Sequence, residues 1–139
     1  MEYTMAGSVK PLTALAAQAV TGAVEGEIID SYEFNSMTFI ISTGAITSDV
    51  TLTLEHSDNS DFSASEVVPS DVVFGELPVL TAAGYANKQC WLGYFGKKRY
   101  VRLSVASGAA DLNAVALLGH PEQAPTLGPN SSGQYPNYG

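Results

Sequence analysis

Short runs of alternating apolar and polar residues constrain the fold of this chain more than any other feature. In segment 49–56 (DVTLTLEH), Val50, Leu52 and Leu54 alternate with threonines and a glutamate. This is the period-two pattern of a strand with one buried and one solvated face. Further runs that predict strands occupy 27–33, 37–43, 89–95, 99–106 and 113–118, with turn residues such as those at 34–36 and 107–108 between them. No stretch sustains the 3.6-residue period of an amphipathic helix.

Two parts of the chain are less regular. Segment 62–78 carries two prolines and a glycine around the brief apolar pieces 67–68 and 72–74, which predicts a long excursion with one or two very short strands. Segment 12–20 is rich in alanine and fits a short helix or an edge strand equally well. Many short strands without crossover helices predict an all-β fold, namely an antiparallel β-sandwich that is jelly-roll-like.

The end of the chain differs in composition from the rest. Of the chain's 7 prolines, four fall in 121–139, together with Tyr135, Tyr138 and a single charged residue. Such a segment cannot form a core by itself. With 139 residues in total, we expect one β-sandwich domain over 1–120 and an extended Pro/Gly-rich C-terminal arm over 121–139, whose tyrosines bind a partner.

Positive charge is concentrated in one short stretch. The chain has 6 basic and 14 acidic residues and a net charge of -8, yet Lys97, Lys98, Arg99 and Arg102 lie within six consecutive positions. We predict that these four residues bind a negatively charged protein neighbour. The alternative is that Lys98 and Arg102 pair across the sheet with Glu55 or another acid of the same chain. So acidic a chain is not expected to bind nucleic acid.

Polar residues that suggest catalysis or metal binding are few. Neither His56 nor His120 has a cysteine, histidine or carboxylate at ligand spacing, so no metal site is expected. Asp58, Asn59 and Asp61 lack the spacing of a calcium loop and are typical of a turn. No nucleophile motif, phosphate-binding loop or paired acids in an apolar setting occurs, so we expect no enzyme activity and no cofactor.

Other features indicate a protein without membrane or redox chemistry. Cys90 is the only cysteine and lies in a predicted strand, where a packed thiol is expected. No apolar run approaches the ~18 residues of a membrane span, so no membrane partner is expected. The start of the chain does not resemble a signal peptide, which favours synthesis in a cytoplasm.

Four aromatic residues lie close together in sequence and admit two interpretations. Trp91, Tyr94, Phe95 and Tyr100 fit a platform that stacks on sugars. Trp91 and Phe95 have one parity while Leu92 and Tyr94 have the other, so both faces of the strand are apolar. This pattern favours packing in the core.

Several strings resemble a known family. Segments 39–47 (FIISTGAIT), 54–59 (LEHSDN), 93–102 (GYFGKKRYVR) and 114–121 (AVALLGHP) are similar to the cement, or decoration, proteins of tailed phages and prophages. The resemblance covers 27–121, and the part beyond residue 124 departs from it. It implies a jelly-roll-like sandwich on the outside of an icosahedral shell, with the major capsid protein as partner and a small homo-oligomer, a dimer in preference to a trimer.

Together these features lead to one expected function. We expect a structural virion protein, made in the host cytoplasm, that binds the outside of the assembled capsid and cements neighbouring subunits of the major capsid protein. The alternative is a β-sandwich on the virion surface that binds a carbohydrate or a receptor. A tail-completion protein is a third and more distant alternative.

Overall fold

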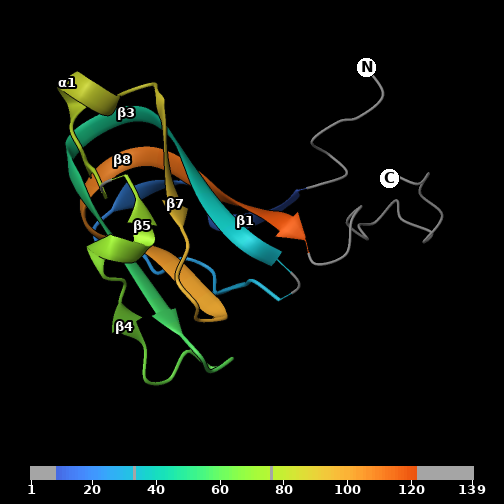
Figure 1. Ribbon diagram of the computed structural model, residues 1–139. Helices are drawn as coiled ribbons and strands as arrows, with labels where there is room; N and C mark the ends of the chain where they lie inside the picture. Colours follow the sequence, from blue (N-terminus) through green and yellow to red (C-terminus); the bar gives the residue numbers. More distant parts are fainter. Residues whose placement is uncertain (1–8, 33, 76, 122–139) are drawn as a thin grey trace, which may run out of the picture.

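The computed structural model describes residues 9–32, 34–75 and 77–121 and is built almost entirely from β-strands (Figure 1). The elements in chain order are β1 (Lys10–Thr21), β2 (Ile29–Asp30), β3 (Phe34–Ser57), β4 (Glu66–Val67), the 3-10 turn η2 (Ser70–Val72), β5 (Val73–Phe74), β6 (Val79–Leu80), α1 (Ala82–Tyr85), β7 (Gln89–Tyr94) and β8 (Tyr100–Pro121). The prediction of an all-β fold is confirmed.

Two long strands organise the sheet. β3 and β8 pair antiparallel along their whole length, from Phe34 opposite Pro121 to Ser57 opposite Tyr100. The strand order is β1-β8-β3-β7-β5, while β2 pairs with β8 and both β4 and β6 pair with β3. Every pairing is antiparallel, as the sequence predicts.

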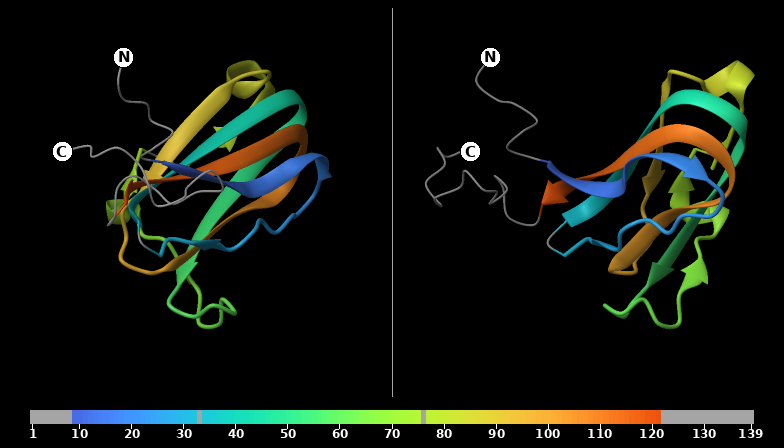
Figure 2. Two further views of the ribbon diagram at one scale, coloured as in Figure 1. Left: turned by 90° about the vertical axis from the view of Figure 1, so that its right-hand side faces the viewer. Right: turned by 180° about the vertical axis from the view of Figure 1, so that it is seen from behind.

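Both long strands bend midway, and this bend creates the interior. The register between β3 and β8 shifts repeatedly between Thr43 and Leu52, and extra residues of this kind bend a strand. In Figures 1 and 2 the two ribbons curve back together, so that each strand contributes to both sides of the fold. Phe39 before the bend and Leu54 after it therefore belong to one buried cluster, together with Leu103 of β8.

The bend also explains where the predicted strand boundaries are wrong. Segments 37–43 and 49–56 are parts of one strand, and the expected separators at 34–36 and 107–108 lie inside β3 and β8. At 107–108 register shifts accommodate turn-type residues without ending the pairing, whereas 34–36 pairs with β8 in regular register. Of the run at 27–33, only Ile29–Asp30 is strand among the residues described.

The less regular segments form the outer elements. Lys10–Thr21 is an edge strand. Of the two structures that the alanine-rich segment 12–20 allows, a short helix and an edge strand, the edge strand is therefore the one that forms. The excursion contains two short strands, Glu66–Val67 and Val73–Phe74, as predicted. Pro121 is the last residue described, so the arm beyond it, with Tyr135 and Tyr138, lies outside the described residues. Within the described part, no helix is long and apolar enough to cross a membrane.

The link between β1 and β2 packs directly on β8. A Cβ atom on Gly26 would lie 1.9 Å from the carbonyl oxygen of Leu103 and 2.7 Å from that of Ala14. The amide of Gly26 donates to the Ser104 hydroxyl at 3.2 Å, which explains why this polar side chain is buried on the otherwise solvated face of β8. Only glycine allows the two backbones to approach this closely.

Candidate functional site

The four basic residues Lys97, Lys98, Arg99 and Arg102 form the basic cluster, of which the first three lie on the turn between β7 and β8 and Arg102 lies on β8. A buried polar pair anchors this turn. The turn backbone crosses the ring of Tyr94, so that a Cβ atom on Gly96 would lie 2.4 Å from the Tyr94 hydroxyl oxygen. That hydroxyl lies 2.8 Å from Nδ1 of His56 on β3. Burial raises the pKa of Tyr94 and lowers that of His56. Both groups are therefore neutral near pH 7, and a hydrogen bond between two neutral side chains joins them.

Arg99 lies directly before β8 and belongs to a local ion-pair network. Its Nε and Nη2 donate to the two carboxylate oxygens of Asp30 at 2.7 and 2.8 Å. Its guanidinium also lies 4.6 Å from the ring centroid of Tyr32 and 5.2 Å from that of Tyr100. The hydrogen bonds from Arg99 are the largest cause of the lowered pKa of Asp30. This pair of hydrogen bonds ties the end of β2 to the turn before β8.

The two lysines of the turn have different surroundings. Nζ of Lys98 donates to Asp58 at 3.0 Å, which joins the turn to the loop after β3. Lys97 is exposed and forms no ion pair among the residues that the structure describes. Lys97 is therefore the member of the cluster whose charge is open to a partner.

Arg102 lies on the outward face of β8 and is mostly covered. Its guanidinium stacks 4.5 Å from the ring centroid of Phe62, and its Nη1 lies 3.5 Å from a carboxylate oxygen of Glu25. Glu55 is its neighbour across β3, but the ion pair forms with Glu25. The Nε atom of Arg102 is buried without a hydrogen-bond partner in the described part of the chain. The side chain therefore acts as packing as much as charge.

Three of the four basic residues predicted to bind a partner form ion pairs within the chain. Lys98 and Arg102 pair with acids of the same chain, which is the alternative that the sequence left open. Arg99 does the same. Surface ion pairs stabilise a fold by only ~0.2–1 kcal/mol each, so they do not preclude exchange with an acidic neighbour. The binding of a partner by Lys97, Lys98, Arg99 and Arg102 stays a prediction.

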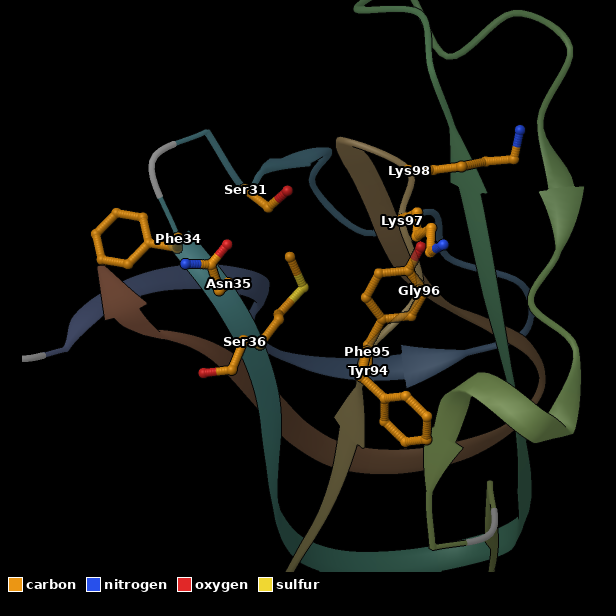
Figure 3. Close-up of a pocket in the computed structure, with 10 residues that line it drawn as sticks. Ser31, Phe34, Asn35, Ser36, Tyr94, Phe95, Gly96, Lys97 and Lys98 are labelled. Carbon is orange, nitrogen blue, oxygen red and sulfur yellow. The ribbon is translucent and has the colours of Figure 1, made fainter. Parts of the chain in front are cut away.

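A surface depression of about 370 Å³ adjoins the cluster. Figure 3 shows it between the start of β3, with Phe34 and Asn35, and the turn after β7, with Phe95 and Gly96. Ser31, Ser36, Met37, Tyr94, Lys97 and Lys98 complete its lining. Hydroxyl groups and the amide of Asn35 make this lining suited to binding a polar surface, whereas the side chain of Lys98 points away from the depression and binds Asp58.

The other polar candidates have structural roles. Within 9–32, 34–75 and 77–121, no group of three or more histidines, cysteines, aspartates or glutamates is placed to hold a metal ion. Asp61 accepts from the amide of Ser63 at 3.0 Å and Asn59 donates to the Ser63 carbonyl at 3.1 Å, which confirms the turn. Cys90 is half-buried against the core, and burial raises the pKa of its thiol.

Three exposed aromatic side chains lie on the outward face of β7 or next to it. Leu92 and Tyr94 are buried as expected, but Trp91 is 68% exposed and Phe95 is 55% exposed, so the expectation of core packing is wrong for these two. Phe74 of β5 pairs with Gly93 of β7 and is 71% exposed. Because Trp91 and Phe95 share one parity, the sequence indicates that both side chains lie on the same side of the sheet. Parity alone does not reveal that no described element covers this side.

By its fold this chain belongs to the class of antiparallel all-β proteins, and two long bent strands organise its sheet. A similar fold occurs in the crystal structure of the SPBc2 prophage-derived protein YomS, with a TM-score of 0.53 and 18% sequence identity. The match covers 79% of this chain and 91% of the YomS chain, and at this identity it shows the fold alone. No known protein family matches the chain, and no curated protein matches it.

Proposed function

We propose that this protein is a structural phage protein that binds the outside of the assembled capsid and cements neighbouring subunits of the major capsid protein. The observation that supports this most is the fold shared with a prophage-derived protein over 79% of the chain. The resemblance of the strings at 39–47, 54–59, 93–102 and 114–121 to cement proteins points the same way. The protein would act without catalysis or a cofactor, on the virion, after synthesis in the host cytoplasm.

In this proposal, binding of the protein to assembled capsid subunits shifts the equilibrium toward the assembled shell. A protein that binds assembled subunits better than separate ones stabilises the assembly by RT ln(1 + [L]/Kd), about 2.7 kcal/mol at a hundred times Kd. The depression beside Lys97 and Lys98 supplies polar contacts, and Lys97 supplies an exposed positive charge. The binding surface on the capsid would accordingly be polar and acidic.

The experiment compares binding to shells of the major capsid protein. The charge reversal Lys97→Glu should weaken binding at least several-fold and leave the unfolding temperature unchanged, because Lys97 makes no ion pair in the described chain. Lys88→Glu is the matched control, since Lys88 is an exposed lysine outside the cluster. Equal loss with both variants would indicate a non-specific effect of net charge.

A carbohydrate- or receptor-binding protein of the virion surface is the second candidate. The exposure of Trp91 and Phe95 favours it, because aromatic rings on a sheet face stack on sugars. Titration of soluble oligosaccharides should then change the fluorescence of Trp91, the only tryptophan of the chain. No change across a panel of glycans would remove this candidate.

A further inference from the structure

The depression beside the basic cluster reaches the hydrophobic core. Met37 of β3 and Tyr94 of β7 lie opposite each other in the strand register, are 3% and 4% exposed, and belong to its lining. Phe34, which packs against the core, lies on one side of the depression in Figure 3, and Gly96 lies on the other. Part of the lining is therefore apolar and continuous with the core.

Polar groups belong to the same lining. The Ser31 hydroxyl donates to the carbonyl of Arg99 at 2.8 Å, so its oxygen can still accept a hydrogen bond. Lys97 contributes an exposed ammonium group. Small-ligand pockets have volumes of ~300–1,000 Å³ and combine apolar walls with a few polar groups, and this depression, at about 370 Å³, falls at the small end. Such a site fits a single aromatic ring with a polar tip.

The last described residue of the chain lies at the edge of this depression. β8 ends at Pro121, which pairs opposite Phe34, and Phe34 lines the depression. Figure 1 shows the end of β8 beside the start of β3. Residues 122–139 follow Pro121 directly, so the C-terminal arm starts beside the site.

The arm carries the kind of side chain that the depression fits. Its aromatic residues are Tyr135 and Tyr138, 14 and 17 positions after Pro121. An extended chain spans ~3.3 Å per residue, so up to roughly 46 Å of backbone joins Pro121 to Tyr135, which is enough to return to the site. Glu122, the only charged residue of 122–139, is opposite in sign to Lys97, so these charges do not oppose docking.

We propose that the arm folds back on its own chain and that the ring of Tyr135 or Tyr138 occupies the depression. The ring contacts the Met37 thioether, since sulfur and aromatic rings attract each other, and its hydroxyl donates to Ser31. Because the arm is tethered beside the site, the effective concentration of its tyrosines is high, and a contact too weak to hold a free peptide is sufficient. The inference concerns the free protein and does not depend on binding to a capsid.

A docked arm also changes the surface that the protein presents to a partner. The arm then lies beside Lys97, so the arm and the exposed charge of the basic cluster form one continuous surface. An arm that is already held in place loses less conformational entropy when it binds a partner. Only one of the two tyrosine rings occupies the depression, so the other remains for that contact.

The test is NMR of the full chain with ¹³C-labelled methionine methyl groups. We expect nuclear Overhauser contacts between the methyl group of Met37 and a tyrosine ring of the arm. The double variant Tyr135→Ser with Tyr138→Ser should abolish these contacts and shift the Met37 methyl signal, because the ring current of the docked tyrosine is lost. Asn137→Ser is the matched control, since it lies between the two tyrosines and removes no ring. The contacts should not change over a tenfold range of protein concentration.

Three results would overturn the proposal. They are a Met37 signal that the double variant leaves unchanged, an equal shift in Asn137→Ser, and contacts that strengthen with protein concentration, which would place the arm in the depression of a second copy. Binding to capsid shells is measured separately. If the Met37 contacts are absent and shells still bind the protein, this inference fails and the proposed function stands. If the contacts are present and shells do not bind it, the proposed function fails and this inference stands.

Discussion

The hydroxyl of Tyr94 lies 2.8 Å from Nδ1 of His56, beneath the turn that carries the basic cluster. The two rings meet edge to face, with centroids 5.8 Å apart. His56 is buried, and the charge of Lys98 adds to the effect of burial in lowering its pKa, while Glu66 and Asp58 oppose this effect. The anchor of the turn is therefore a neutral histidine that accepts a proton poorly.

The low pKa of His56 in its contact with Tyr94 predicts that the fold loses stability in mild acid. The pKa of His56 in the folded state lies below 6.5, so the unfolded chain binds more protons just below that pH. Stability is then fully present above about pH 6.5 and falls as the pH drops through this value. Thermal unfolding between pH 7.5 and 5.5 should show this fall. His56→Asn keeps a hydrogen-bonding group near the position of Nδ1 but removes the titrating ring, so it should flatten the dependence. An unchanged slope would rule out His56 as its cause.

A second prediction separates packing from charge in the basic cluster. Arg102→Glu should lower the free energy of unfolding by about 1–2 kcal/mol, because it removes the contact with Phe62 and sets a third acid near Glu25 and Glu55. Lys97→Glu, at an exposed position without an ion pair in the described chain, should change it by less than about 0.5 kcal/mol. Urea unfolding measures both. Equal effects would mean that net charge, and not the packing of Arg102, determines the loss.

The buried face of β8 could be predicted from the sequence, but the length of the strands and the partners of the basic cluster could not. Alternation of Val101, Leu103 and Val105 with polar residues predicted a strand with one buried face, and all three are buried. Alternation is local, so it could not show that β3 continues past Gly44 or that β8 continues through Gly108. These continuations depend on pairing between residues more than 50 positions apart. The basic cluster was visible in sequence, but its partners Asp30, Asp58 and Glu25 depend on the fold.

Gly26 provides a test of the close contact between backbones. Gly26→Ala should destabilise the fold by about 3 kcal/mol or more, because the new Cβ atom would meet two carbonyl oxygens that belong to paired strands. Gly84→Ala is the control. A Cβ atom there would meet only the Thr81 hydroxyl oxygen, at 3.2 Å, and its effect should stay within about 1 kcal/mol. If Gly26→Ala proves neutral, the link between β1 and β2 does not pack on β8 as described.

Deletion of 122–139 tests the predicted arm. The buried core residues in the described chain run from Ala14 to Leu118, so the truncated protein should fold with a free energy of unfolding within about 1 kcal/mol of the full chain. Binding to capsid shells should weaken, because Tyr135 and Tyr138 are predicted to bind a partner. Full occupancy and unchanged heat resistance of the shells would exclude the arm from the mechanism.

Co-sedimentation with capsids tests the proposed function most directly. Purified protein would be mixed with shells assembled from the major capsid protein of the phage or prophage that encodes it, and in parallel with unassembled subunits. The proposal predicts saturable binding to shells at a fixed ratio, at least tenfold tighter than to separate subunits, and a higher temperature of shell disruption. Absence of binding to shells, or equal affinity for separate subunits, would contradict it.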